Sequence, residues 1–333
     1  MQRPPSRRCV RCRQVVLRQT AARTSAHDAA VDTGQSCSGW CAGRNDRDTG
    51  WRFARWAALT NGRGTVCVFT GRGEYIEKYF ETVRDLRQRG YAVAVIDWRG
   101  QGHSSRRLRN PHKGHVHNFS EYQIDVAAFV KQVVLPDCPP PYFALAHSMG
   151  CAVLLRAAHA GLEVFERFVL CAPMIDLPRP RASLPMRGLM RMLRVAGMGE
   201  RFIPGGSIDL FKSTGFPGNP LTSDPRRYAR NAAILEADPT LRIASPTVAW
   251  LDAAFAAMAE FRSPEFAERI RQPVLMLAAG DDTIVSAPAI AAFARDLPAG
   301  SHRVIAGAKH EMLQEDDRYR AQIWAAFDAF MPG

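Results

Sequence analysis

Residues 146–150 place a serine where an apolar run gives way to a helical stretch. The run at 142–146 ends in Ala146, and Ser148 follows within the sequence Ala-His-Ser-Met-Gly. A tight strand-to-helix turn of this kind lifts the serine oxygen above a sheet, and small neighbours on both sides prevent a clash. The pattern predicts a nucleophilic Ser148, with alanine at a position where glycine is usual. By itself, the same match would also fit an ordinary serine at a helix N-terminus.

The residue types that a serine nucleophile needs lie downstream in a suitable order. In a parallel sheet with such a turn, an acid and then a histidine follow the serine, each after a later strand. The apolar run at 274–278 leads into Asp281 and Asp282. Of the two histidines beyond it, His302 precedes the last short apolar run and His310 follows that run. This order selects His310 as the base and favours Asp282 over Asp281 as the acid.

Together these residues predict acyl transfer through a covalent intermediate. His310 would take the proton of Ser148, whose oxygen attacks an ester carbonyl, while Asp282 would orient the imidazole and stabilise its charged form. The resulting oxyanion needs two backbone N–H donors. We expect one from Met149, directly after the nucleophile, and one from Arg72 in the glycine-rich loop that follows the first parallel strand.

The elements that must position these residues follow from the pattern of apolar runs. From residue 50 onward, short apolar runs alternate with amphipathic stretches, which is typical of parallel strands joined by crossover helices. Strands are expected at 66–69, 91–96, 142–146, 168–172, 274–278 and 303–305. The predicted fold class is α/β, with a mostly parallel central sheet and helices on both of its faces.

The alternation stops for one long stretch of the chain. Residues 177–245 are rich in Arg, Met, Gly and Pro and contain helical pieces without strand-like runs. We therefore predict that 49–176 and 246–333 form the core, that 177–245 form a helical cap inserted into it, and that 1–48 form an N-terminal tail.

Three local interactions are expected from short patterns. Ser120 and Gln123 fit a capping box at the start of a helix. Ser245, which precedes a proline, fits the N-cap of the first helix after the cap. Asp97 and Arg99 are expected to pair and to steady the turn that contains them.

The composition of the chain is typical of a soluble globular protein. Its 333 residues are 47% hydrophobic and 23% charged, with a net charge of +12 and a mean hydropathy of -0.19. No apolar run reaches the ~18 residues of a membrane span. Only five of the cations are lysine and residues 1–48 alone contribute +5, so arginine-biased coding explains the charge. Without a clustered basic face in a folded motif, no nucleic-acid partner is expected.

The tail at 1–48 has no acid in its first 27 residues and several arginines. It resembles a transit peptide and lacks the apolar core of a secretory signal. Low hydrophobicity predicts disorder, or a start codon assigned too far upstream. Its four cysteines are Cys9, Cys12, Cys37 and Cys41. The second pair departs from the usual zinc-site spacing and no strand signal surrounds it, so no zinc site is expected.

The other cysteines and the clustered histidines indicate neither a metal nor a cofactor. The cysteines of the body are Cys67, Cys138, Cys151 and Cys171. They predict buried thiols in a reducing compartment, and therefore a cytoplasmic protein. The clustered histidines are His103, His112, His115 and His117. No acidic ligands accompany them, which favours hydrogen-bonded loop histidines over a metal site.

Six short motifs along the body of the chain recur together in one known family. They are Thr70-Gly71-Arg72-Gly73-Glu74, Asp97-Trp98-Arg99-Gly100-Gln101-Gly102-His103-Ser104, Asn110-Pro111-His112-Lys113-Gly114-His115-Val116, Ala146-His147-Ser148-Met149-Gly150, Gly280-Asp281-Asp282 and Lys309-His310-Glu311. From about residue 51 to its end, the chain resembles the bacterial lysophospholipase and monoacylglycerol lipase branch of the α/β-hydrolases. The resemblance implies the α/β-hydrolase fold and a serine hydrolase that cleaves a single-chain lipid ester, either a lysophospholipid or a monoacylglycerol. Thr70 stands where this family often has histidine, so contacts of that side chain do not carry over.

Two other functions remain open at this point. One is a short-chain carboxylesterase or acyltransferase with the same catalytic residues and a pocket too small for a long acyl chain. The other is a catalytically silent hydrolase fold that serves as a binding protein, against which the complete set of Ser148, Asp282 and His310 argues.

The stretch 177–199 carries five arginines, no acid, and several Met and Leu residues. A cationic segment with flexible apolar side chains suits a lid that touches an anionic membrane surface or guides a phosphate-bearing lipid. A cap helix that packs its apolar face on the core would give the same pattern. The expected partners are therefore a small lipid or ester substrate and transient contact of the cap with the inner face of the membrane.

Overall fold

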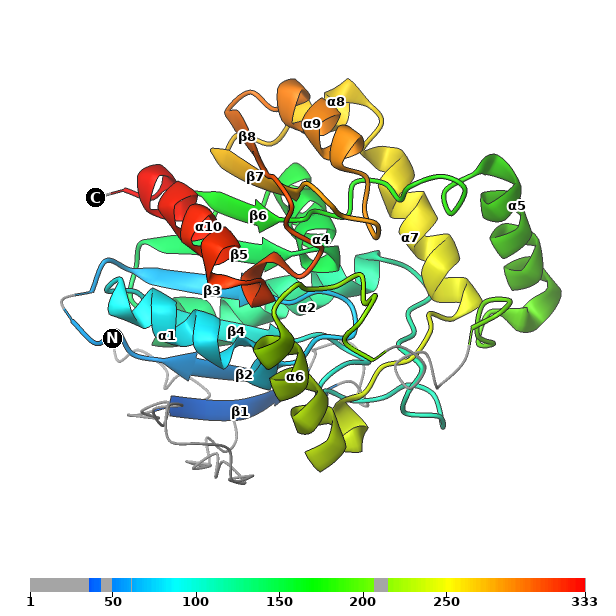
Figure 1. Cartoon of the computed structure of the whole chain (residues 1–333), viewed down its shortest axis with the longest axis horizontal. Helices are drawn as coiled ribbons and strands as arrows, with labels where there is room; N and C mark the ends of the chain where they lie inside the picture. The colour runs from blue at the N-terminus through cyan, green and yellow to red at the C-terminus, as the bar shows by residue number, and fades with distance from the viewer. Residues whose placement is uncertain (1–35, 43–49, 61, 207–214, 333) are drawn as a thin grey trace, which may run out of the picture.

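A single twisted sheet forms the centre of the computed structural model, which describes residues 36–42, 50–60, 62–206 and 215–332 (Figure 1). The strand order is β1-β2-β4-β3-β5-β6-β7-β8. β2 pairs antiparallel with both β1 and β4, and all other neighbours are parallel. The strands are β1 Ser36–Ala42, β2 Gly50–Trp56, β3 Thr65–Phe69, β4 Ala92–Asp97, β5 Tyr142–His147, β6 Phe168–Cys171, β7 Val274–Ala279 and β8 Gly300–Ile305.

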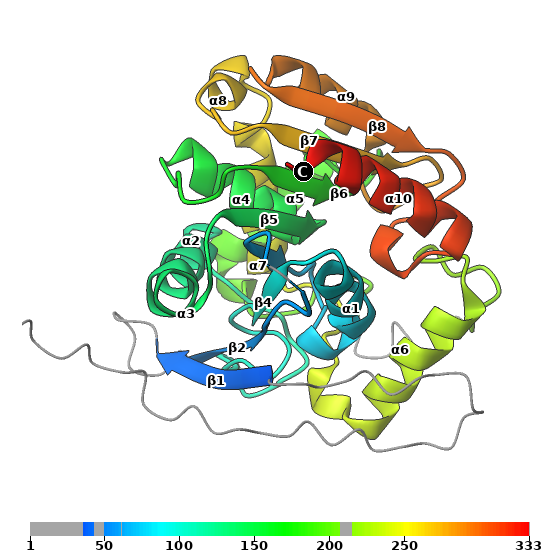
Figure 2. The ribbon, with the colours of Figure 1, turned by 90° about the vertical axis from the view of Figure 1, so that its left-hand side faces the viewer.

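Helices cover both faces of this sheet. They are α1 Phe80–Gln88, α2 Ser120–Phe129, α3 Leu135–Asp137, α4 Met149–His159, α5 Leu184–Leu193, α6 Pro225–Ala237, α7 Val248–Glu260, α8 Pro264–Glu268, α9 Ala287–Asp296 and α10 Asp317–Phe330. α1 and α10 lie on one face, and α2 and α4 lie on the other (Figure 2). The central strands are buried along their whole length, as expected for parallel strands covered on both sides. The predicted α/β architecture is confirmed.

All six predicted strands are present, and the largest difference is at β8, which begins at Gly300 instead of 303. β1 and β2 were not expected. β1 falls within 1–48, where the sequence analysis predicted a tail without strands, so that prediction is wrong for residues 36–42. β1 forms through backbone pairing along the edge of β2, which needs no apolar pattern of its own. The rest of the tail and its zinc-site cysteines lie outside the described side chains.

Between β6 and α7 the described residues form helices and loops. α5 packs against α7, while α6 lies on the other side of the molecule, near α1 and α10 (Figure 1). We continue to treat 177–245 as a cap. Among the described residues, none of the helices combines the length and the apolar character needed to cross a membrane.

Two predicted helix caps are wrong. The N-cap position of α2 is Phe119, and the first amide of the helix, that of Ser120, donates to Asn118 Oδ1 at 2.9 Å, whereas Gln123 donates to the carbonyl of Val153. α7 begins at Val248, and Thr247 caps it by accepting from the Trp250 amide. In both cases the accepting oxygen comes from a residue two positions away from the expected one, and Thr247 has the extended backbone that a capping residue requires.

The predicted Asp97–Arg99 pair is also wrong. Arg99 forms an ion pair with Asp125 of α2 at 2.7 Å. Asp97 instead accepts hydrogen bonds from the amides of Ile76 and His103 and pairs with Arg52 of β2 at 3.3 Å. The two side chains leave the turn toward different elements, so the turn is held by long-range partners.

Candidate active site

A strained turn carries Ser148 between β5 and α4. Its backbone has φ 50° and ψ -112°, a conformation that residues other than glycine adopt rarely and at a cost of about 1–3 kcal/mol. Gly150 makes the close approach possible, because a Cβ there would lie 2.4 Å from the Phe69 oxygen and 2.7 Å from the Thr70 oxygen. The Ser148 amide donates to the Cys171 carbonyl at 3.0 Å. The neighbouring strands β3 and β6 therefore fix the turn.

The three residues selected from the sequence meet at the carboxyl edge of the sheet. His310 Nε2 lies 3.0 Å from Ser148 Oγ, and His310 Nδ1 lies 2.8 Å from Asp282 Oδ2. The other carboxylate oxygen of Asp282 accepts from the amides of Ile284 and Val285. Burial alone would raise the pKa of Asp282, but the His310 contact and these amides outweigh it and lower that pKa. Asp282 is thus held as a carboxylate that faces the imidazole.

Asp281, the other candidate acid, has a different environment. Its side chain is exposed to solvent and makes no contact with His310. Its amide donates to the Ala308 carbonyl at 2.9 Å, which ties the loop after β7 to the loop that carries His310. The geometry brings Asp282 to the histidine and turns Asp281 away.

Two backbone amides near Ser148 are available as donors. Met149 is the first residue of α4, where an amide has no partner inside the helix. Arg72 lies between Gly71, whose amide donates to Glu74, and Gly73, whose amide donates to Gln101. Neither the Arg72 amide nor the Met149 amide has an acceptor among the described residues. Both amides are free to donate, and they stay our predicted oxyanion donors.

A family model described as serine aminopeptidase, S33 matches residues 60–317. Lysophospholipase L2 of Escherichia coli strain K12 is 34% identical over 281 residues, which is 81% of this chain and 80% of the relative. The chain belongs to the serine aminopeptidase S33 family. The probable lysophospholipase L2 of Haemophilus influenzae is 27% identical, over 81% of this S33 hydrolase and 84% of the relative.

Solved structures agree with this fold. A soluble variant of monoglyceride lipase from Saccharomyces cerevisiae, in complex with a substrate analog, superposes with a TM-score of 0.71 at 20% identity, covering 92% of this chain and 98% of that one. A thermostable carboxyl esterase from Bacillus coagulans gives 0.72 at 21% identity, over 89% and 97% of the two chains. The α/β-hydrolase fold, the family resemblance and the expected enzyme class, a carboxylic ester hydrolase, are confirmed.

The S33 hydrolase also contains a buried carboxylate that joins its catalytic loops. Glu74 accepts from the Gly71 amide, from the Tyr79 hydroxyl at 2.5 Å, and from Lys78 Nζ at 2.9 Å. Lys78 Nζ also lies 2.6 Å from Glu311, next to His310. The sequence analysis missed this network, although the spacing of Glu74 and Lys78, four residues apart, is a recognisable ion-pair signal.

His147 extends the network from Glu74 to the catalytic histidine. Its Nε2 lies 2.9 Å from the His310 carbonyl, which can only accept, so this nitrogen carries a proton. Its Nδ1 lies 3.1 Å from Glu74 Oε2. Burial alone would raise the pKa of Glu74 and lower that of His147, but their mutual attraction outweighs burial, so that the pKa of Glu74 is lowered and that of His147 is raised. Both neighbours of the ring, a carbonyl and a carboxylate, are acceptors, so this site favours the charged form of His147.

A segment of the cap holds the loop of His310 from the other side. Buried Glu315 accepts from the Lys309 amide at 2.7 Å and from the Ser223 amide at 3.0 Å. The Glu311 amide donates to the Leu221 carbonyl at 2.8 Å. The chain on both sides of His310 is thus connected, directly through Glu311 and indirectly through Glu315, to the loop that leads into α6.

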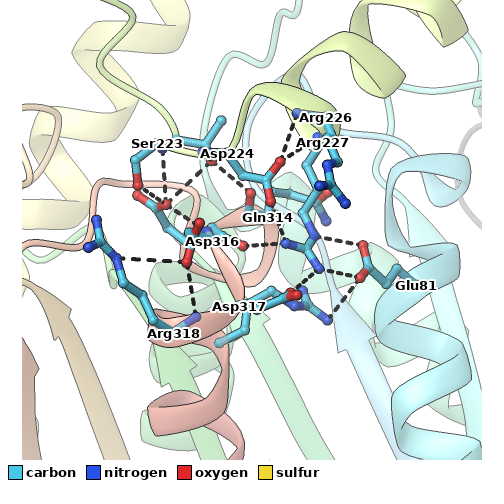
Figure 3. Close-up of polar contacts among 12 residues, drawn as sticks. Glu81, Ser223, Asp224, Arg226, Arg227, Gln314, Asp316, Asp317 and Arg318 are labelled. Carbon is cyan, nitrogen blue, oxygen red and sulfur yellow. Dashed lines mark hydrogen bonds and ion pairs between the residues drawn. The ribbon is translucent and has the colours of Figure 1, made fainter.

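Arg227 fastens the start of α6 to the core. Its guanidinium lies 2.6 Å from Glu81 of α1, 2.6 Å from Asp317 of α10 and 2.6 Å from Asp224, its own helix cap (Figure 3). Burial alone would raise the pKa of Glu81, but hydrogen bonds and charges from the surrounding arginines lower it below its ordinary value. This cluster connects α6 to helices α1 and α10.

The clustered histidines make hydrogen bonds to the chain just before α7. His112 Nδ1 lies 3.0 Å from the Arg242 carbonyl, and His115 Nδ1 lies 3.0 Å from Thr247 Oγ1. His103 Nε2 lies 2.9 Å from Asp238. No group of three potential metal ligands comes together in the described part of the chain.

The four cysteines of the body, Cys67, Cys138, Cys151 and Cys171, are free thiols. Burial raises the pKa of Cys138 to about 11 and that of Cys171 to about 12. Both thiols are therefore protonated near neutral pH and are poor nucleophiles.

Proposed function

We propose that this S33 hydrolase cleaves carboxylic esters of single-chain lipids, either lysophospholipids or monoacylglycerols, through an acyl-enzyme on Ser148. The observation that carries the proposal is the continuous hydrogen-bonded row from Ser148 Oγ through His310 to Asp282, at 3.0 and 2.8 Å. A hydroxyl, an imidazole and a carboxylate at these distances can activate a nucleophile and return its proton to a leaving group.

The reaction uses groups that the site already orients. His310 Nε2 removes the proton of Ser148 as Oγ attacks the ester carbonyl, and Asp282 stabilises the imidazolium that forms. The amides of Arg72 and Met149 donate to the oxyanion. Collapse of the tetrahedral intermediate releases the alcohol, which takes the proton from His310. A water molecule, deprotonated by His310, then hydrolyses the acyl-enzyme.

The lipid assignment rests on the relatives. The Escherichia coli relative is a lysophospholipase, and the yeast neighbour is a monoglyceride lipase. The second candidate is a short-chain carboxylesterase or acyltransferase with the same residues, which the neighbouring Bacillus coagulans carboxyl esterase keeps open.

A panel of esters tests the proposal. p-Nitrophenyl esters of increasing chain length, lysophosphatidylcholine and monoacylglycerol are assayed with the wild type and with Ser148→Ala. We expect hydrolysis of the long-chain lipids and a loss of about 10³-fold or more in Ser148→Ala. Full activity of Ser148→Ala would refute the mechanism, whereas a preference for acetyl or butyryl esters would support the second candidate.

Contact between α5 and an anionic lipid surface is part of the proposal. Leu184, the first residue of α5, is 78% exposed, Met192 is 60% exposed, and Val195, in the helical turn that follows α5, is 77% exposed, while Met190 packs inward. An apolar outer face on a helix without acidic residues suits insertion between anionic headgroups. The proposed location is the cytoplasm with contact at the inner membrane face, and the free thiols support a reducing compartment.

Arg187 and Arg194 are ion-paired to Asp176 and Asp252, so reversing their charges would disturb the fold as well as the surface. Leu184→Ser with Val195→Ser is a cleaner change, and Leu135→Ser, at a site 52% exposed in α3, is its control. We expect the double variant to float less with anionic liposomes and the control to float like the wild type. Equal flotation of all three proteins would exclude contact through α5.

A further inference from the structure

Arg72 carries a guanidinium that no carboxylate neutralises. Its Nε is buried without a hydrogen-bond partner, and its Nη2 makes one hydrogen bond, to the Ala244 carbonyl at 2.7 Å. No carboxylate of the described residues pairs with it, and burial lowers its pKa to about 10, so it remains charged near neutral pH. A buried unpaired cation is costly and calls for an explanation.

Two buried arginines of the sheet and its loops, Arg52 and Arg99, have acidic partners instead. Arg52 pairs with Glu77 and Asp97, and Arg99 pairs with Asp125 and Glu121. These guanidinium groups have acidic partners that are fixed in the fold. Arg72 stands apart from them because its partner carbonyl is neutral and most of its N–H donors are unused.

The Arg72 guanidinium lies against the chain that enters α7, which contributes Ala244 and Trp250 to its surroundings. Arg72 offers its backbone amide to the proposed oxyanion, and its side chain reaches the wall formed by the chain that enters α7. There the guanidinium lies 5.0 Å from the ring of Trp250. A Cβ at Gly114 would come within 3.8 Å of Nη2, so this wall is closely built around the cation. The ring of Trp250 packs on the planar face of the guanidinium, and no carboxylate of the described residues pairs with its N–H groups.

We infer that Arg72 binds the phosphate of a lysophospholipid headgroup, which makes the chain a phosphate-selecting lysophospholipase. This inference rests on the proposed ester hydrolysis at Ser148. In a lysophospholipid the phosphate is attached to the same glycerol as the scissile ester, a few bonds from the carbonyl. That span is comparable to the span of an arginine side chain from its amide to its guanidinium. One residue can therefore contact the oxyanion and the phosphate together.

Phosphate chemistry fits the donors that are free. A guanidinium offers parallel N–H groups that match two phosphate oxygens, and a charge-assisted pair of this kind is stronger than a neutral hydrogen bond. A monoacylglycerol offers only hydroxyls at the same position and leaves the cation unpaired.

The test compares two lipids that differ only in the phosphate. 1-Oleoyl lysophosphatidic acid and 1-oleoylglycerol are presented in the same detergent micelles, and kcat and KM are measured for each. Arg72→Gln removes the charge and keeps a donor for the Ala244 carbonyl, and Arg72→Lys keeps a charge. Arg106→Gln is the matched control, because Arg106 also donates to a carbonyl of the same cap segment, that of Thr240, at 2.9 Å.

We expect the ratio of kcat/KM for the phosphate lipid over the glyceride to fall roughly 10- to 100-fold in Arg72→Gln, mainly through a higher KM. In Arg72→Lys the ratio of kcat/KM values should stay close to that of the wild type, and in Arg106→Gln it should equal the wild-type ratio. Each variant is also checked for its melting temperature, since loss of the fold would lower both activities alike.

The remaining outcomes separate the two proposals. If Arg72→Gln lowers both activities equally, or neither, Arg72 is a structural strap and the inference is overturned while ester hydrolysis stands. If the wild type cleaves only the glyceride, the inference about Arg72 is likewise overturned while ester hydrolysis stands. If the wild type cleaves neither lipid nor any p-nitrophenyl ester, the proposed function fails and the inference fails with it.

Discussion

Replacing Glu74 by glutamine tests whether one buried carboxylate positions the catalytic loops. Glu74 accepts from the oxyanion loop at Gly71, from Lys78 and from His147. A glutamine side chain has one acceptor oxygen in place of two. Its NH₂ group would therefore face some of the N–H donors that now bond to the Glu74 carboxylate. Lys78 would keep Glu311 as a partner at 2.6 Å, but His147 would lose the only carboxylate that it contacts among the described residues.

The loss of the carboxylate partner of His147 sets the size of the expected change in stability. Removing one partner of a buried ion pair costs about 3–5 kcal/mol when the other charge remains buried. His147 can release its proton and glutamine keeps one acceptor, so we expect the low end, a loss of about 3 kcal/mol in the free energy of unfolding. The Arg72 amide would be displaced from its position without being removed, so kcat should fall about 10- to 100-fold, less than the loss of an oxyanion donor.

The pH dependence of stability gives a second readout. The raised pKa of His147 contributes stability that is complete below its unfolded value near 6.5, and that stability is lost as pH rises through the folded pKa. The lowered pKa of Glu74 contributes stability above its unfolded value, lost as pH falls through the folded pKa. In Glu74→Gln both contributions should disappear, which flattens the stability profile on both sides of neutrality.

Urea unfolding across pH and kinetics with a p-nitrophenyl ester measure these effects. Glu77→Gln is the control, because Glu77 pairs with Arg52 and makes no contact with the catalytic loops. Wild-type kcat in Glu74→Gln, or an equal loss of kcat in Glu77→Gln, would refute the positioning role.

Two further substitutions address the site directly. Asp282→Asn should lower kcat by about 10²- to 10⁴-fold, because the imidazole loses its orienting carboxylate, while Asp281→Asn should keep near-wild-type kcat; the reverse result would make Asp281 the acid. Gly150→Ala should destabilise the protein by about 3 kcal/mol, because its Cβ would lie 2.4 Å from the Phe69 oxygen, whereas Gly188→Ala in α5, with open space around the Cβ, should not. A fully stable Gly150→Ala, measured by urea unfolding, would contradict the tight packing of the turn.

Local patterns in the sequence determined the sheet and the order of the candidate residues. Apolar runs predicted the strands β3 to β7, because strands buried on both faces need apolar side chains at every position, whereas only the end of the mostly exposed β8 was predicted. Ser148, Asp282 and His310 could be selected because the carboxyl ends of parallel strands meet at one edge of a sheet. These inferences depend on neighbours along the chain, which a sequence displays directly.

Only the tertiary structure decided which partners the charged side chains take. Arg99 pairs with Asp125 and not with Asp97, which is nearer in sequence. Glu74 contacts His147, which is 73 residues away in the sequence. β1 pairs along the edge of β2, although no apolar run in the sequence predicts a strand there. In the sequence nothing distinguishes Arg72 from other loop arginines. Only the structure shows that its guanidinium has no acidic partner among the described residues. Ion pairs and edge strands depend on which segments approach in space, and that information is absent from local periodicity.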